Sequence, residues 1–560
     1  MTGAELLLKT LSELGVNTIF GFPGGSALPI YDALYSCKEI RHIRTVHEQG
    51  AAHAADGYAR ATGKVGVVLS TSGPGATNLV TGIANAYMDS VPLLAFTGQV
   101  ALDLLGRDSF QEVDITGITL PITKHSFLIR NKNEIVKKVK EAYTIATSGR
   151  PGPVLIDLPK DVMAGEVNYD EVEKEVNGFV RTYLTKLEPS SGFNKLVEKA
   201  AEMIEKAKKP VIYAGGGIVT SDAAEELLKL AEKINAPVTT TLMGLSSFPA
   251  DHPLALGMLG MHGTAYANMA VTECDLLIAL GARFDDRVTG DVKKFAPNAK
   301  IIHVDIDRAE IGKNVDVDLG IKADVKQFLI NLLDILPSVK NEDWVNEVAR
   351  MKNLYPLKYS EEGLKPQYVI EEIYRQSKGE AIIVTEVGQH QMWAAQYYKF
   401  KEPRTFISSG GLGTMGFGLP AALGAKVGRK DKIVFNIAGD GSFEMNCHEL
   451  ITASRHKIPV ITVIFNNRTL GMVRQWQELF FDKRYSQVSL EGADVNYAKL
   501  AEACGVQGFE VDDKNELPKI IHNAIQLNAP VVIDVKIDAE ENVMPMVPAG
   551  KPISEMLGID

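Results

Sequence analysis

The chain has 560 residues, 45% hydrophobic and 23% charged, and a formal net charge of −11. This length is too great for one hydrophobic core and favours three or four domains, whereas the acidic balance argues against nucleic acid or an anionic membrane as the main partner. Because no apolar run approaches the roughly 20 residues that span a bilayer, and the four cysteines form neither a disulfide framework nor a zinc-ligand pattern, we expect a cytoplasmic protein.

Short apolar segments alternate with helical patterns along the whole chain. Their apolar residues are continuous rather than alternating, which is typical of strands in parallel sheets covered by helices on both faces. The segments lie at 17–22, 65–73, 92–98, 152–159, 210–217, 275–281, 300–307, 381–388, 432–441, 459–467 and 530–538. This pattern predicts an α/β fold with three doubly wound parallel-sheet domains.

Two charged segments without buried strands, 166–192 and about 338–366, are interpreted as linkers. No clean internal sequence repeat relates the parts that they separate. The predicted units are an N-terminal domain, a central domain, a C-terminal domain and a tail rich in Met, Pro and Gly that we interpret as a lid, at 1–165, 190–335, 366–540 and 541–560.

The third domain carries the strongest functional pattern. One apolar strand ends in the sequence GDGS (439–442), and the next strand ends in Asn467. Ligands of open parallel sheets bind at the carboxyl ends of strands, so Asp440 and Asn467 are expected to converge there. Their oxygens suit Mg²⁺, and Gly441 lets backbone N–H groups approach a phosphate. Either motif alone is explained by an ordinary turn or loop, but together they favour a metal–diphosphate site.

A second pattern lies in the first domain, where Glu48 follows a short strand and begins an Ala-rich helix. Considered alone, this acid needs no function beyond stabilising the helix dipole. Joined to a metal–diphosphate site, it indicates thiamine diphosphate. That cofactor requires a carboxylic acid that hydrogen-bonds the pyrimidine N1′ and favours the imino tautomer, whose 4′-imino group takes the proton from thiazolium C2.

The chain resembles thiamine-diphosphate enzymes of the pyruvate oxidase/decarboxylase superfamily, and within it the large catalytic subunits of acetohydroxyacid (acetolactate) synthases. The likeness covers essentially the whole length. It is carried by GVNTIFGFPGG (15–25), TSGPGATNLVTGIANAYMDSVP (71–92), SFQEVDI (109–115), GMLGMHGTAYAN (257–268), GARFDDRVTG (281–290), TEVGQHQMW (385–393), GLGTMGFGLPAA (411–422), NNRTLGMVRQWQELF (466–480) and PMVPAGKP (545–552).

The resemblance implies roles for residues of the third domain. Asp440, Asn467 and the backbone of Thr469 resemble the metal ligands. Met415 resembles an apolar wedge that bends the cofactor, although ordinary core packing also explains a methionine. The remaining residues that resemble contacts of thiamine diphosphate are Gly388, Gln389, His390, Gly413, Gly439, Gly441, Ser442 and Met472.

The resemblance also implies substrate contacts. Gly25 resembles a backbone donor beside the oxygen of the first substrate, and Trp476 resembles the residue that favours 2-oxobutanoate as second substrate. Arg283 fits a carboxylate clamp, with a flavin contact or an interdomain ion pair as the alternative. Further residues that resemble the substrate channel are Phe110, Gln111 and Lys160.

The central domain has the residues of a nucleotide site. A glycine turn follows one strand, and Asp305 and Asp307 end another, where carboxylates suit ribose hydroxyls. The alternative is a glycine turn needed only for helix–sheet packing. By resemblance the domain binds FAD, in a structural or vestigial role, through Gly215, Gly216, Gly217, Met258, His262, Arg283, Asp305, Asp307 and Asp324.

The implied reaction is decarboxylation of pyruvate and transfer of the hydroxyethyl group to a second 2-oxo acid. Pyruvate would give 2-acetolactate and 2-oxobutanoate would give 2-aceto-2-hydroxybutyrate, first steps towards branched-chain amino acids. A flavin-redox pyruvate oxidase, a fermentative FAD-independent acetolactate synthase and a non-catalytic nucleotide-binding protein are the alternatives. Because Glu48 and the metal motif lie in different domains, we expect a homodimer or homotetramer whose cofactor bridges two chains. A separate small regulatory subunit is expected from the family alone.

Overall fold

The structure is a computed structural model that describes residues 1–168 and 192–559. Most of the predicted linker at 166–192 lies outside the described residues. Three six-stranded sheets are present, and every strand pairing in them is parallel, which confirms the predicted α/β fold. Within the described ranges, each helix is too short or too polar to cross a bilayer.

The first sheet has the strand order β2-β1-β3-β4-β6-β5. Helices α1, α2, α7 and α8 cover one face and α3, α5 and α6 the other. The strands are β1 (Thr18–Gly21), β2 (Arg41–Arg44), β3 (Gly66–Ser70), β4 (Leu93–Gln99), β5 (His125–Leu128) and β6 (Pro153–Pro159). The helices are α1 (Gly3–Glu13), α2 (Leu28–Ser36), α3 (Glu48–Thr62), α4 (Pro74–Thr77), α5 (Val80–Met88), α6 (Ile115–Thr119), α7 (Ile135–Thr147) and α8 (Lys160–Ala164).

The central sheet has a different order, β12-β11-β10-β7-β8-β9. Its strands are β7 (Pro210–Ala214), β8 (Val238–Thr240), β9 (Ala255–Met258), β10 (Leu276–Leu280), β11 (Lys300–Asp305) and β12 (Leu319–Lys322). Its helices are α11 (Phe193–Lys206), α12 (Gly216–Thr220), α13 (Ala224–Ile234), α14 (Ala265–Glu273), α15 (Asp286–Thr289), α16 (Val325–Ile335) and α17 (Glu342–Leu354).

Helix α17 lies inside the segment 338–366 that the sequence analysis interprets as a linker. The segment is therefore not a plain connection. Trp344, Val348 and Met351 share one helical face and pack on the central core, and Trp344 Nε1 donates to the Pro210 carbonyl at 3.1 Å. The charges on the other face of α17 conceal this apolar stripe in the sequence.

The third sheet, β14-β13-β15-β16-β18-β17, repeats the order of the first. Its strands are β13 (Ile382–Thr385), β14 (Phe406–Ile407), β15 (Val434–Gly439), β16 (Val460–Asn466), β17 (Gln507–Val511) and β18 (Val531–Lys536). Its helices are α18 (Pro366–Ser377), α19 (Gln389–Tyr397), α20 (Gly418–Gly428), α21 (Asp440–Glu444), α22 (Leu450–His456), α23 (Gly471–Phe480), α24 (Tyr497–Ala503) and α25 (Leu517–Leu527).

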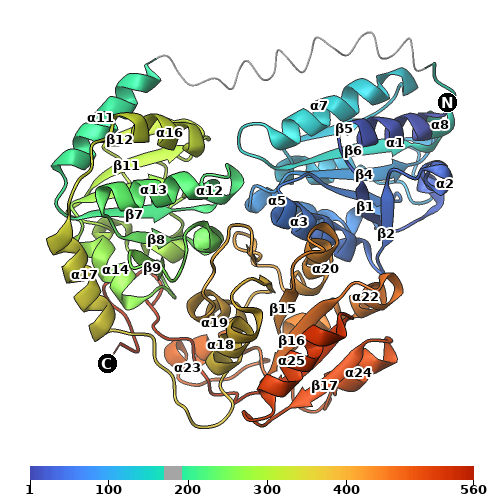
Figure 1. Ribbon diagram of the computed structural model, residues 1–560. Helices are drawn as coiled ribbons and strands as arrows, with labels where there is room; N and C mark the ends of the chain where they lie inside the picture. The colour runs from blue at the N-terminus through green and yellow to red at the C-terminus, as the bar shows by residue number, and fades with distance from the viewer. Residues whose placement is uncertain (169–191, 560) are drawn as a thin grey trace.

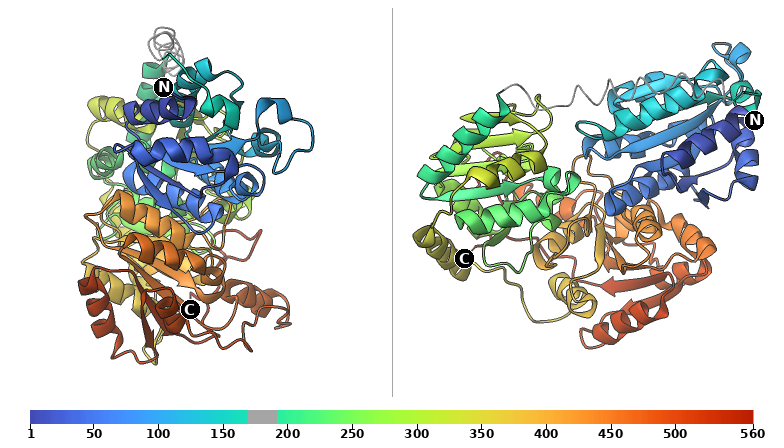
Figure 2. Two further views of the ribbon diagram at one scale, coloured as in Figure 1. Left: turned by 90° about the vertical axis from the view of Figure 1, so that its right-hand side faces the viewer. Right: turned by 45° about the horizontal axis from the view of Figure 1, so that its top comes forward.

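The first and third sheets are stacked with α3 and α20 between them, and the central sheet lies beside both (Figures 1 and 2). The two helices approach closely because glycines face the opposite backbone. A Cβ on Gly57 would lie 2.1 Å from the Ala421 carbonyl oxygen, and one on Gly424 would lie 1.8 Å from that of Ala54. One apolar cluster therefore runs from the first sheet through both helices into the third.

The tail, predicted as a lid, runs from the third sheet to the central one. Gln475 Nε2 of α23 donates to the Val543 carbonyl at 3.0 Å, and Val547 N–H donates to the Met261 carbonyl at 2.8 Å. Closure by this tail stays a prediction.

Candidate active site

One pocket opens at the carboxyl end of the third sheet. It lies between the ends of β13 and β15, the point where the strand order reverses direction, which is where ligands bind in open α/β sheets. The residues that line it are Val387, Gly388, Gln389, His390, Trp393, Met415, Gly439, Asp440, Gly441, Ser442, Phe465, Asn467, Thr469, Leu470, Gly471, Met472 and Val473. Nearly every residue that the sequence analysis assigns to the diphosphate and metal is therefore brought together here.

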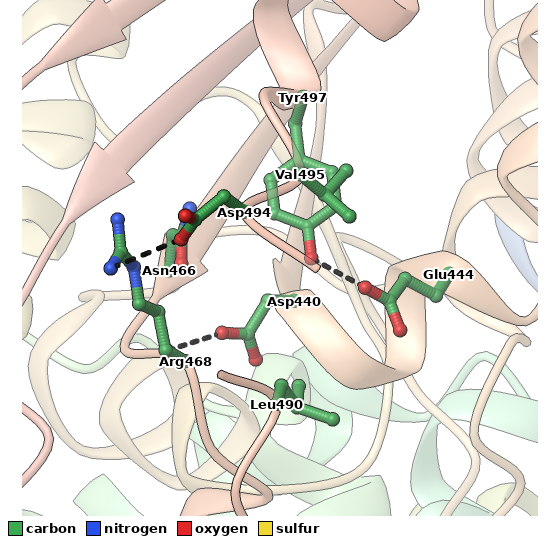
Figure 3. A pocket seen from close by; sticks show the side chains of 8 residues that line it. All are labelled: Asp440, Glu444, Asn466, Arg468, Leu490, Asp494, Val495 and Tyr497. Carbon is green, nitrogen blue, oxygen red and sulfur yellow. Dashed lines mark hydrogen bonds and ion pairs between the residues drawn. The ribbon is translucent and has the colours of Figure 1, made fainter. Parts of the chain in front are cut away.

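Asp440 is the buried acid of this pocket. Its Oδ1 accepts from Gly441 N–H at 2.8 Å and its Oδ2 from Arg468 N–H at 2.6 Å, while burial raises its pKa to about 7. Figure 3 shows a second group of residues around Asp440, in which the Tyr497 hydroxyl donates to Glu444 Oε1 at 2.7 Å. A cation in the pocket would offset the burial of the Asp440 charge.

Asn467 and Thr469 supply the other oxygens. Asn467 follows β16, and its Oδ1 accepts from Thr469 N–H at 3.2 Å, whereas the Thr469 hydroxyl donates away from the pocket to the Val488 carbonyl at 3.0 Å. In residues 1–168 and 192–559, no group of three or more His, Cys, Asp or Glu side chains is arranged to hold a metal ion. A metal here would therefore bind one carboxylate with amide and carbonyl oxygens, the set that suits Mg²⁺.

The pocket wall opposite Asp440 carries unpaired polar groups at the start of α19. Gln389 Oε1 and His390 Nε2 are buried without a hydrogen-bond partner in the described part of the chain, and burial lowers the pKa of His390 to about 3. Such orphaned groups fit a bound ligand that completes their hydrogen bonds. Gly413 does not line the pocket, but its Cα faces the Val387 side chain that does.

Glu48 is the first residue of α3 and lies outside this pocket. Its Oε2 accepts from Asn78 Nδ2 at 3.0 Å, and a Cβ on Gly75 would lie 3.2 Å from its Oε1. The Gly75 turn follows β3, and β1 and β3 flank the strand-order reversal of the first sheet. Glu48 thus faces the crevice of the first sheet, at the position where the third sheet has its pocket.

Other predicted substrate residues lie around the same crevice. Gly24, the neighbour of Gly25, packs on Thr71, and Gln111 packs against Gly73. Gly25 itself faces open space, and the Phe110 side chain is 88% exposed. Lys160 begins α8 and is exposed, and the structure gives it no contact with this group.

Arg283 and Trp476 lie at contacts between domains. Arg283 Nη1 donates to the Met88 carbonyl at 2.6 Å, and its Nη2 lies 3.9 Å from Asp89 Oδ1. Arg283 therefore forms an interdomain ion pair, one of the two alternatives to a carboxylate clamp. Trp476 stacks under the Arg287 guanidinium, 5.7 Å from the ring centroid.

The predicted flavin residues occupy the reversal point of the central sheet, between β7 and β10. Gly215 and Gly217 pack directly on Gly281, so these glycines are required for packing, which does not decide whether a nucleotide also binds here. Burial raises the pKa of Asp305 to about 6, and its Oδ1 accepts from Asp307 N–H at 2.8 Å.

The other predicted flavin residues are more scattered. Gly216 faces Met243, and Met258 lies in the core shared with the third sheet. His262 is half-buried, and burial of its ring lowers its pKa to about 4. Asp324 caps α16 through Gln327 N–H at 3.1 Å, which occupies its carboxylate.

Several residues that hold the site escape sequence reasoning. Asn78 contacts Glu48, and Asp89 accepts from the N–H groups of Gly410 and Gly411 at 2.9 and 2.7 Å, which fixes the loop before Met415. Both residues lie in the motif at 71–92, and polar residues there that a solvent-exposed helix does not require could have identified them.

Comparisons with known proteins agree with this geometry. Models of three thiamine pyrophosphate enzyme domains match the chain: the N-terminal TPP binding domain at 1–118, the central domain at 197–332 and the C-terminal TPP binding domain at 386–535. A probable acetolactate synthase large subunit of Methanocaldococcus jannaschii is 51% identical over 100% of this chain and 95% of its own length. The acetolactate synthase large subunits of Cyanidium caldarium and Corynebacterium glutamicum are 49% and 48% identical, over 100% and 99% of this chain and 97% and 90% of their own lengths.

Proposed function

Since the chain belongs to the acetolactate synthase large subunits, a family of thiamine pyrophosphate enzymes, we propose that it catalyses their carboligation. It decarboxylates pyruvate and transfers the hydroxyethyl group to a second 2-oxo acid, giving 2-acetolactate from pyruvate or 2-aceto-2-hydroxybutyrate from 2-oxobutanoate. The observation that carries this proposal is the third-sheet pocket, where an oxygen donor set and unpaired polar groups meet at a strand-order reversal.

The residues of the pocket fit thiamine diphosphate and Mg²⁺. Asp440, Asn467 and the Thr469 carbonyl would hold the metal. His390 Nε2, which has no partner in the described part of the chain, would donate to a diphosphate oxygen. Gln389 would lie beside the diphosphate, where its unpaired Oε1 is an acceptor and needs a donor such as water. When bound, the thiazolium ring supplies the electron sink for the carbon–carbon chemistry. The protein supplies position and electrostatics.

Glu48 is the proposed activating acid. Its carboxyl would share a proton with the pyrimidine N1′, and Asn78 would hold it in place for that contact. Around it, the backbone of Gly25 would donate to the substrate oxygen. Phe110, Gln111, Lys160, Arg283 and Trp476 would form the substrate channel of the assembled enzyme.

The active unit is proposed to be a homodimer. The pocket of one chain is lined only by residues between Val387 and Val473, and Glu48 of the same chain faces a separate crevice. A cofactor that touches both groups is therefore best placed between two copies, where the exposed Phe110 would also be covered. Pairing of dimers into a tetramer and a separate small regulatory subunit are proposed from the family alone.

FAD is proposed for the central sheet. The support is its position: the glycine turn after β7 lies at a strand-order reversal, the acid Asp305 ends β11 two strands away on the same sheet, and the neighbouring stretches resemble flavin-binding ones. A yellow protein with flavin absorption would support it, whereas a colourless holoenzyme of full activity would indicate the FAD-independent type.

The reaction is tested by incubating the protein with pyruvate, thiamine diphosphate and Mg²⁺. Acetolactate is the expected product. Acetate or acetyl phosphate with reduction of an electron acceptor would instead assign the chain to the pyruvate oxidase reaction. Adding 2-oxobutanoate measures the acceptor preference.

The shared site is tested by mixing two inactive variants, Glu48→Gln and Asp440→Asn. After subunit exchange, a mixed dimer has one intact site, so roughly a quarter of wild-type activity should return at equal amounts. No recovery, with exchange verified by mass, would place both groups of each site in one chain.

A further inference from the structure

A buried carboxylate of the third domain lies at the start of helix α3. Glu449 is 0% exposed and follows the diphosphate segment, in the short helix η8 (Cys447–Glu449). Its Oε1 accepts from His47 N–H at 3.0 Å and from Val46 N–H at 3.2 Å, and its Oε2 accepts from Val46 N–H at 3.2 Å. These partners lie about four hundred residues away in the sequence.

The two N–H groups immediately precede Glu48. The first N–H groups of a helix have no partner within the helix, and its N-terminus favours negative charge. The N-cap residue His47 serves one of them, since its Nδ1 accepts from Gln49 N–H at 3.1 Å. The N–H groups of Val46 and His47 are served by Glu449 instead. The position of the first helical residue thus depends on a side chain from another domain.

Helix α3 has a glycine, Gly50, at the position that faces the Glu449 carboxylate. A Cβ on Gly50 would lie 2.3 Å from Glu449 Oε1, so an alanine there would push the carboxylate away. Glycine is less favourable than alanine within a helix, and burying a charge is costly unless it is hydrogen-bonded. The helical glycine and the buried charge both belong to the contact between Gly50 and Glu449, which indicates that the close approach of the carboxylate to α3 is required.

The surroundings hold the Glu449 carboxylate in one orientation. Thr452 Oγ1 donates to Oε2, and His448 Nε2 lies 3.6 Å from Oε1. Burial raises the pKa of Glu449, and the hydrogen bonds from Thr452, Val46 and His47 oppose that rise, with Arg455 as a weaker favourable charge.

We infer that Glu449 is a positioning residue for the activating acid. By binding the main chain at Val46 and His47, it sets where α3 begins and hence where the Glu48 carboxyl stands relative to the pyrimidine N1′. This inference rests on the proposed role of Glu48, and Glu449 itself touches neither cofactor nor substrate.

The test replaces Glu449 by glutamine in the full chain with saturating thiamine diphosphate and Mg²⁺. One acceptor oxygen becomes an NH₂ group that faces the Val46 N–H. Exchange of the cofactor C2 proton for deuterium should slow about tenfold, while the Kd for the cofactor stays unchanged. The matched control is Glu502→Gln, an exposed acid of α24 in the same domain. Wild-type exchange in Glu449→Gln would overturn the inference.

A second pair of variants keeps the test informative if Glu449→Gln folds poorly. Gly50→Ala should slow exchange because the new Cβ displaces the carboxylate. Gly57→Ala is the matched control in the same helix, because its Cβ meets the Ala421 carbonyl and not Glu449, so it should slow exchange less. Wild-type exchange in a folded Gly50→Ala protein with an unchanged cofactor Kd would contradict a contact acting through position 50.

Epistasis separates this inference from the proposed function. In a Glu48→Gln background, Glu449→Gln should cause no further loss of exchange, because the group it positions is gone. An equal further loss would overturn the positioning role. If Glu48→Gln exchanges at the wild-type rate, the role of Glu48 fails and the inference fails with it. If Glu48→Gln is slow and Glu449→Gln is not, the inference alone fails.

Discussion

The first and third sheets have the same strand order, yet their crevices differ in what they contain. In the third, the ends of β13 and β15 enclose a pocket with the buried acid Asp440 and neutral His390. In the first, a Cβ on Gly25 would meet no atom within 4 Å, and Phe110 is exposed.

The same strand order places a possible binding site at the same point of both sheets, and the side chains at that point decide what it can bind. The third crevice is closed by its own domain and can anchor a ligand. The first presents one acid, Glu48, whose position is set by Asn78 and by Glu449 of the other domain. We therefore propose that the site of the third sheet anchors the cofactor and that Glu48 activates it. The predictions below test that division.

The largest effect is expected for Glu48→Gln. The variant loses the shared proton with the cofactor, so kcat should fall by about 10²–10⁴-fold, the usual contribution of a positioned acid or base. Cofactor and metal affinity should remain, because the anchor is intact. Steady-state kinetics and calorimetric titration measure the two quantities. The control is Glu39→Gln, an exposed acid of the same domain. A large loss of affinity would contradict the division.

Asp440→Asn should show the reverse pattern. Removing the pocket carboxylate should weaken Mg²⁺-dependent binding of thiamine diphosphate by on the order of 100-fold. Fluorescence or calorimetric titration at fixed Mg²⁺ measures this. Asp431→Asn is the control, since Asp431 is exposed and pairs with Arg429 before β15, away from the residues that line the pocket. Unchanged affinity would mean that the anchor lies elsewhere.

A smaller effect is expected at the helix pair that joins the two domains. Gly57→Ala and Gly424→Ala each place a Cβ within 2.1 Å of an opposing carbonyl oxygen, and such overpacking costs about 1–3 kcal/mol. Thermal denaturation should show a lower midpoint for both. Lys199→Ala, exposed on α11, should leave the midpoint unchanged. Equal midpoints for all three would show that α3 and α20 separate without cost.

The last prediction concerns the pH dependence of the free energy of unfolding at Glu386, at the end of β13. Burial raises its pKa from 4.5 to about 7, so the folded chain holds a proton there that the unfolded chain releases between these values. Stability from this group therefore falls as pH rises from 4.5 to about 7 and is constant above. Glu386→Gln removes that loss, so its stability relative to wild type should rise by about 2–3 kcal/mol between pH 5 and 8. Denaturation at both pH values measures it, and parallel behaviour of the two proteins would contradict it.

Much of the fold and of the anchor site was predictable because the signals are local. The apolar runs at 432–441 and 459–467 are strands in the structure, and Asp440 and Asn467 meet because consecutive parallel strands end at the same edge. The charged segment around α17 misled the prediction, since the stripe containing Trp344 is outnumbered by polar residues.

What the sequence by itself determined is therefore the three parallel-sheet units, the anchor motif and the presence of an acid at position 48. The tertiary structure alone decided that α3 packs on α20, that Arg283 pairs with Asp89, and that Glu449 binds the main chain before Glu48. The physical reason is sequence separation. Strands and turns are determined by residues that are neighbours in the sequence. A contact across about four hundred residues depends instead on how the surfaces of two domains pack together.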